Sequence, residues 1–133
     1  MKTFLIISLA IFGIPLAAAA NDQKPVDLED VCRAIGAGDI DQLSAVMDAE
    51  VELSILDMEN LYSKQQAITA LKEFFAEVSP VTFGKVHQGA SKAADAEYCI
   101  GTLTTSKGPL KVYVYVAKRS GDILLQELRF ERE

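Results

Sequence analysis

The spacing of the apolar residues changes along the chain, and this change restricts the fold more than any other feature. Before Pro80, apart from one short segment, apolar residues recur at the three- and four-residue intervals of amphipathic helices. After Pro80, apolar and polar residues alternate over several segments, which is the pattern of half-buried strands. Helices followed by a block of strands predict an α+β fold, because an α/β fold would interleave the two kinds of element.

The helices are predicted from their capping residues as well as from their apolar stripes. Asp27, Asp39 and Ser63 each precede an amphipathic segment, and their side chains can accept a hydrogen bond from the first helical turn. Ser63 is followed three residues later by Gln66, so the two residues form a capping box. The predicted helices cover residues 28–37, 40–47 and 64–78.

The strands are predicted from the two-residue alternation. Val51, Leu53 and Ile55 alternate with polar residues and predict one strand before the third helix, followed by a turn at residues 57–60. The short turns between the later strands predict an antiparallel meander. Those later strands are predicted over residues 81–92, 97–105, 110–118 and 123–131.

Residues 1–20 have the pattern of a cleavable secretory signal peptide. Lys2 precedes an apolar stretch that ends in four alanines, which supply the small residues that signal peptidase requires. Cleavage is therefore expected between Ala20 and Asn21. Residues 21–133 then form a single α+β domain in the periplasm or outside the cell.

An uncleaved membrane anchor is the alternative interpretation of this leader. A spanning helix needs roughly 20 apolar residues, and Pro15 would kink a helix of that length here. No cysteine follows the alanines directly, so a lipid anchor at this site is not expected. No later segment is long and apolar enough to span a membrane.

Composition argues against several classes of function. The formal net charge is −6 and the basic residues are scattered, so nucleic acid is not an expected partner. The single histidine excludes a multi-histidine metal site. The sequence contains no phosphate-binding loop, dinucleotide fingerprint or paired-cysteine zinc motif, so no cofactor and no metal are expected.

The order of the predicted elements resembles the nuclear transport factor 2-like, or cystatin-like, superfamily. The segment RAIGAGD at residues 33–39 resembles that superfamily's opening motif, and YSKQQAI at residues 62–68 resembles its capped third helix. The resemblance implies a cone in which N-terminal helices pack on a curved antiparallel sheet. Because the superfamily includes isomerases, dehydratases, transport factors and binding modules, this fold alone selects no function.

Shorter segments resemble a small exported family from bacteria of the Bacteroidetes type. These segments are ELSILDMENLYSKQQA, HQGAS, YCIGTLTT and LLQELRFE. That family is described only as a domain of unknown function. The resemblance therefore implies a fold and a compartment, and it carries no catalytic residues that could be transferred to this chain.

Three residues are candidates for catalysis. His87 is the only side chain with an ordinary pKa near neutrality, and it could act as a general base if a carboxylate oriented it. Tyr98 and Asp57 could form part of an oxyanion site, as a tyrosine and an acid do in the ketosteroid isomerases of this fold. The simpler interpretation is that His87 and the tyrosines have only structural packing roles.

Five residues are candidates for binding. Tyr113 and Tyr115 lie on one face of a strand that the helices need not cover, so this face could be a dimer interface. Glu127 and Arg129 share a face of the last strand and could line a cavity mouth or form a surface ion pair. Phe75, on the third helix, faces the interior of the predicted cone.

The two cysteines permit a disulfide if the chain is exported. Cys32 lies on the apolar stripe of the first helix, and Cys99 lies in the middle of a strand. Their Cα atoms would have to lie within about 7 Å of each other. Two separate buried cysteines are the alternative.

Three functions are compatible with these observations. The first is a non-catalytic periplasmic binding or accessory module for a small apolar ligand or a protein partner, in the space between the third helix and the sheet. The second is an isomerase- or dehydratase-like enzyme in the same cavity. The third is a structural homodimer formed through the outer face of the sheet. An open cavity would favour the enzyme, whereas a cavity filled by phenylalanines would count against it.

Overall fold

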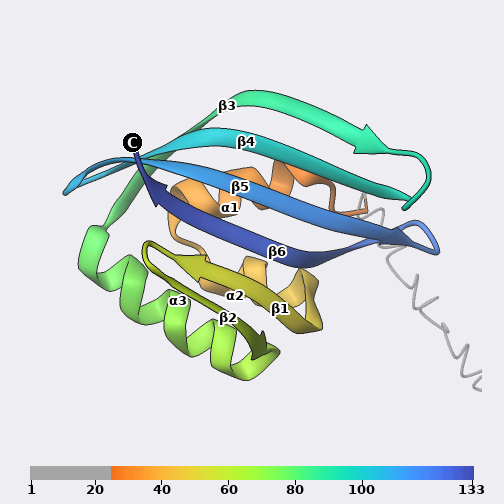
Figure 1. Ribbon diagram of the computed structural model, residues 1–133, viewed down its shortest axis with the longest axis horizontal. Coiled ribbons are helices and arrows are strands. Elements are labelled where there is room, and N and C mark those ends of the chain that lie inside the picture. Colours follow the sequence, from red (N-terminus) through yellow and green to blue (C-terminus); the bar gives the residue numbers. More distant parts are fainter. Residues whose placement is uncertain (1–24) are drawn as a thin grey trace, which may run out of the picture.

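The computed structural model describes residues 25–133. The predicted leader and its cleavage site between Ala20 and Asn21 lie outside the described residues. The elements are α1 (Leu28–Ala37), α2 (Ile40–Val46), β1 (Met47–Ile55), β2 (Met58–Ser63), α3 (Lys64–Val78), β3 (Pro80–Ser91), β4 (Ala96–Thr105), β5 (Gly108–Arg119) and β6 (Asp122–Arg132) (Figure 1). The α+β architecture expected from the sequence is confirmed.

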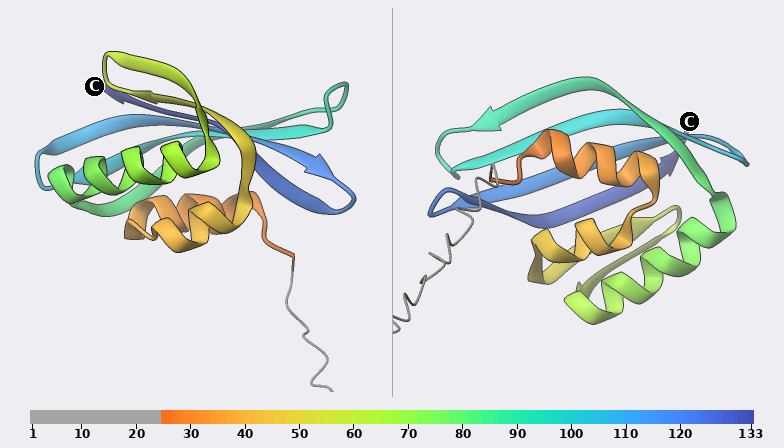
Figure 2. Two further views of the ribbon diagram at one scale, coloured as in Figure 1. Left: turned by 90° about the horizontal axis from the view of Figure 1, so that it is seen from below. Right: turned by 180° about the vertical axis from the view of Figure 1, so that it is seen from behind.

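One curved sheet of six strands carries all the helices of the described part on a single face (Figures 1 and 2). The strand order is β2-β1-β6-β5-β4-β3. The strands β3 to β6 form the antiparallel meander that the short turns predicted. Helix α1 packs on β3 and β4, and α3 packs on β1 and β2 at the other end of the sheet.

The sheet differs from the prediction in two respects. The turn predicted at residues 57–60 is wrong in extent, because only Leu56 and Asp57 form it and the following residues become strand β2. Backbone pairing with β1 supplies the partners that hold these polar residues in a strand. The sheet is antiparallel, as expected, except that β1 pairs with β6 in parallel.

The helix boundaries follow the predicted caps. Asp27 accepts a hydrogen bond from the backbone N–H of Asp30, and Ser63 forms the expected capping box with Gln66. Helix α2 ends one residue earlier than predicted, because the backbone of Met47 is already extended and begins β1. The side chain of Met47 is nevertheless buried, as predicted.

The core fills the space between the helices and the sheet. The rings of Phe74 and Phe75 on α3 lie 5.0 and 5.8 Å, centroid to centroid, from the ring of Phe130 on β6. Phe130 is fully buried, and the two α3 rings are at most 6% exposed. Apolar side chains therefore occupy the place where a ligand cavity was expected. The largest fully buried residues also include Leu28, Ile35, Leu43, Leu53, Leu71, Leu103, Leu125 and Leu128.

Candidate functional site

The sheet face opposite the helices is uncovered in the part of the chain that the structure describes. We call it the outer face. On β5, the buried Val112, Val114 and Val116 point into the core, so the residues between them point the other way. Strand pairing places two rows of side chains side by side across this face. One row is Gly89, Tyr98, Tyr115, Glu127, Glu52 and Leu61, and the other is His87, Ile100, Tyr113, Arg129, Ser54 and Glu59.

Aromatic rings cover the β3–β5 part of the outer face. The His87 Nε2 atom lies 3.2 Å from the Tyr98 hydroxyl, at hydrogen-bond distance, and the Tyr98 ring stacks on Tyr113 with centroids 6.1 Å apart. Gly89 makes room for this arrangement, since a Cβ atom there would lie 2.4 Å from the Tyr98 hydroxyl oxygen. A bulge between Lys85 and His87 brings the histidine onto this face.

A shallow depression of about 330 Å³ lies across β1, β2, β5 and β6. We call it the acidic depression. Its apolar contacts come from Tyr115 and Leu61, and the Leu61 side chain is 62% exposed. Its charged residues are all carboxylates, and the complete lining is Asp48, Glu50, Glu52, Leu61, Tyr115, Gln126 and Glu127.

The carboxylates of the acidic depression are only partly neutralised. Hydrogen bonds from the Gln126 amide and from a backbone N–H lower the pKa of Asp48, which therefore stays ionised at neutral pH. Glu52 lies beside Glu127 in the strand register, and like charges in such positions repel each other. Within residues 25–133, the side-chain carboxylates of Glu50 and Glu52 have no hydrogen bond and no ion pair.

A second depression, of about 340 Å³, adjoins the first and shares Glu127 with it. Arg129 bonds to Glu127 at 2.6 Å and to Glu59 at 3.2 Å, so this guanidinium is held between two carboxylates. Partial burial and the Glu127 carboxylate raise the pKa of the Tyr113 hydroxyl, which therefore stays protonated and able to donate a hydrogen bond. The lining is Ile100, Lys111, Tyr113, Glu127, Arg129 and Glu131.

The three residues predicted as catalytic candidates do not meet in one place. His87 and Tyr98 contact each other, but on the exposed outer face. Asp57 lies in the β1–β2 turn with its side chain 90% exposed, and it pairs with Arg132 at 3.3 Å. Phe75, predicted to face a binding cavity, packs inside the core.

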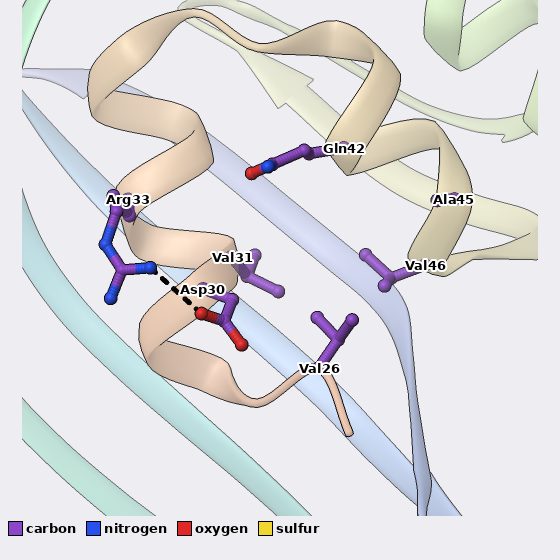
Figure 3. A pocket seen from close by; sticks show the side chains of 7 residues that line it. All are labelled: Val26, Asp30, Val31, Arg33, Gln42, Ala45 and Val46. Carbon is purple, nitrogen blue, oxygen red and sulfur yellow. Dashed lines mark hydrogen bonds and ion pairs between the residues drawn. The ribbon is translucent and has the colours of Figure 1, made fainter. Parts of the chain in front are cut away.

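A small pocket lies between α1 and α2. Figure 3 shows Val26, Val31 and Val46 on its apolar side and the ion pair of Asp30 with Arg33 on its polar side. Its volume is about 200 Å³. Pockets that enclose drug-sized ligands usually measure about 300–1,000 Å³, so this one would hold only a very small molecule.

Comparison of the sequence with models of protein families gives a match over most of the chain. Residues 28–131 match the model described as Domain of unknown function (DUF4783). The chain belongs to the DUF4783 family. This match covers every helix and nearly all of the sheet of the described part.

Solved structures of two DUF4783 family proteins are similar to this domain. The protein from Bacteroides ovatus is 28% identical with a TM-score of 0.70, and the similarity covers 75% of this chain and 89% of that one. The protein from Bacteroides uniformis is 22% identical with a TM-score of 0.75, over 81% of this chain and 98% of that one. An Rd1NTF2_05 variant, 15% identical with a TM-score of 0.60 over 73% and 86% of the two chains, shows the NTF2-like fold. No curated protein matches this DUF4783 domain.

The sequence pointed to Glu127 as a binding candidate, but not to the acidic residues that β1 contributes to the outer face. Asp48, Glu50 and Glu52 appear in it only as the polar partners of a half-buried strand. Leu61 lies in the segment that begins with the predicted turn. The parallel pairing of β1 with β6, which no local pattern reveals, brings these residues beside Glu127 and Tyr115.

Two further features of this DUF4783 domain concern metals and membranes. Among the described residues, no group of three or more histidine, cysteine or acidic side chains is arranged to hold a metal ion. Over the same residues, the helices are too short or too polar to cross a membrane.

Proposed function

We propose that this DUF4783 domain is a non-catalytic binding module whose outer face holds a basic segment of a protein partner. The observation that carries the proposal is the acidic depression, in which four carboxylates surround Tyr115 and Leu61 without a lysine or arginine in the lining. A lysine or arginine side chain would neutralise Glu50 and Glu52, whose carboxylates have no ion pair within the described residues. It would also lie against the Tyr115 ring, which attracts cations.

The shape of the outer face supports an extended partner rather than a small molecule. Small-molecule sites usually enclose most of their ligand, whereas the two adjoining depressions are shallow and continue across several strands. The rings of Phe74, Phe75 and Phe130 pack against one another between α3 and the sheet, and a half-open depression of about 380 Å³ remains beside Phe74. This packing gives less support to a small apolar ligand or to an enzyme in the cone.

The charge of the outer face also argues for a partner other than a second copy. Two copies joined through their acidic depressions would bring carboxylates toward each other, which costs free energy. A basic partner instead gains from the attraction, and its association is expected to weaken as salt rises.

Binding to a short labelled peptide rich in lysine tests the proposal. We expect E50Q/E52Q to weaken the affinity for this peptide about five- to tenfold, since each exposed ion pair is worth up to about 1 kcal/mol. Tyr115→Ala is expected to weaken it further by a similar factor through the lost ring contact. Fluorescence anisotropy at low and high salt measures both effects.

The matched control for this experiment is E73Q/E77Q on α3, the helix on the opposite side of the sheet. This variant removes the same two charges, and it should leave the affinity unchanged. If both double variants weaken binding equally, net charge alone attracts the peptide, and the outer face is not the site. If the protein self-associates and E50Q/E52Q strengthens that association, the occupant is a second copy and the proposal is overturned.

The proposed place of action is the periplasm or the cell exterior, because residues 1–20 have the pattern of a signal peptide. Protein purified from its own host is expected to begin at Asn21. Intact-mass measurement checks this, and retention of the leader on the mature protein would contradict it.

A further inference from the structure

The two cysteines of this domain meet in its core. Cys32, on α1, and Cys99, on β4, are separated by 67 positions in the sequence. Their Sγ atoms lie only 2.9 Å apart. Cys32 is 4% exposed and Cys99 is fully buried. Both belong to the main core cluster, so the contact is part of the packing of α1 on the sheet.

We propose that Cys32 and Cys99 are joined by a disulfide that fastens α1 to the sheet in the exported protein. A disulfide has an S–S distance of about 2.05 Å, so a displacement of less than 1 Å would bring the sulfur atoms to bonding distance. Side-chain rotation supplies such a movement. The inference rests on the predicted export of the chain and is independent of the partner proposed for the outer face.

Other roles of a cysteine pair fit this environment less well. A catalytic or redox-sensing thiol needs a low pKa and access to its substrate. Here the contact between the two sulfurs lowers the pKa of the Cys32 thiol and raises that of Cys99. Cys32 is only 4% exposed and Cys99 is fully buried, so neither thiol has the access to a substrate that such a role needs. A metal site would require further ligands, and the described residues provide no such group.

The bond requires an oxidant, which we identify as the disulfide of a thiol–disulfide oxidoreductase outside the cytoplasm. The thiolate of one cysteine attacks that disulfide, forming a mixed disulfide and releasing one oxidoreductase thiol. The other cysteine then attacks the mixed disulfide as a thiolate, forming the Cys32–Cys99 bond and releasing the second thiol. The two cysteines lose two protons and two electrons, and the oxidoreductase is reduced. Because both sulfurs are buried in the folded domain, this exchange takes place before folding is complete.

The expected result is a mature protein without free thiols. The full chain is expressed in its own host, recovered from the cell envelope or medium, and denatured with an alkylating reagent. Without reductant, no alkyl group should be added, and the intact mass should be about 2 Da below that of the dithiol. After reduction, two alkyl groups should be added. Two alkyl groups added without reductant would overturn the proposal.

Thermal unfolding provides a second readout and a matched control. A link over this sequence separation removes much of the entropy of the unfolded chain. Because the sulfurs are buried, the reductant is added to unfolded protein and kept present during refolding, and protein treated in this way should melt on the order of 10 °C below the untreated protein. C32A/C99A should melt at the same temperature with and without reductant. If the wild-type melting temperature also does not respond to reductant, the bond is absent. The alkylation result on the wild type decides the question even if the double variant fails to fold.

Discussion

Phe130→Ala is expected to destabilise the domain by about 3–5 kcal/mol, which is the usual cost of removing a fully buried phenylalanine. Phe130 is 0% exposed, and its ring contacts those of Phe74 and Phe75. It also lies on β6, in the middle of the sheet. The two α3 rings belong to a helix packed on that sheet, so they can close only part of the resulting cavity. Since small domains are stable by about 5–15 kcal/mol in total, the loss would be a large share of the free energy of unfolding.

Urea denaturation of the wild type and the variant measures this difference. Phe130→Leu keeps most of the apolar contact and is expected to cost less than half as much. Val86→Ala is the surface control, because Val86 is 74% exposed, and it should change the stability by less than about 0.5 kcal/mol. A loss below about 1 kcal/mol for Phe130→Ala would show that the interior is open enough to rearrange, and would restore the ligand cavity as a hypothesis.

Gly36→Ala is expected to destabilise the domain by about 1–3 kcal/mol, although alanine favours helices over glycine by about 1 kcal/mol. Gly36 lies in α1 where this helix approaches β3. A Cβ atom there would lie 2.8 Å from the backbone nitrogen of Phe83 and 3.1 Å from its Cβ. Because these atoms belong to the strand rather than to a flexible side-chain end, α1 must move away from the sheet.

Gly84→Ala is the matched control for this substitution. Gly84 lies in β3, next to Phe83, and a Cβ atom at Gly84 would have no neighbour within 4 Å. This variant should be as stable as the wild type or slightly more stable, because alanine restricts the unfolded chain. Thermal and urea unfolding of both variants give the comparison. If Gly36→Ala is the more stable of the two, the close approach of α1 to β3 is not what requires glycine.

Much of the fold could be predicted because the local signals agree with the final structure. The caps at Asp27 and Ser63 and the stop at Pro80 correspond to real helix ends. Strand β2 was not predicted, because Asp57 and Asn60 are residues that favour turns when only the local sequence is considered. Its extended conformation depends on pairing with β1, which is a tertiary effect. The parallel partner of β1 lies too far along the sequence for any local pattern to indicate it.

The candidate site was less predictable than the fold. The alternation of β5 was sufficient to place Tyr113 and Tyr115 on the face away from the core. The contact between His87 and Tyr98 depends on a bulge in β3 and on the absence of a side chain at Gly89. The alternation of apolar and polar residues in the sequence indicates neither feature. The acidic depression depends on strand order, so the residues that β1 and β2 add to Tyr115 and Glu127 are recognised only once the sheet is assembled.

The position of β6 has a consequence for how the chain can fold as it is made. Within the described residues, β6 is the last element in sequence, yet it hydrogen-bonds to both β1 and β5 and is the only strand that joins the two halves of the sheet. Until residues 122–132 are available, β2-β1 and β5-β4-β3 are separate antiparallel pieces, each with one edge that lacks its partner strand. Such non-local pairing is slow to form. A chain built this way cannot complete its sheet until β6 has been synthesised. The signal peptide predicted at residues 1–20 would be compatible with such a delay, because a secreted chain is expected to cross the membrane before it folds.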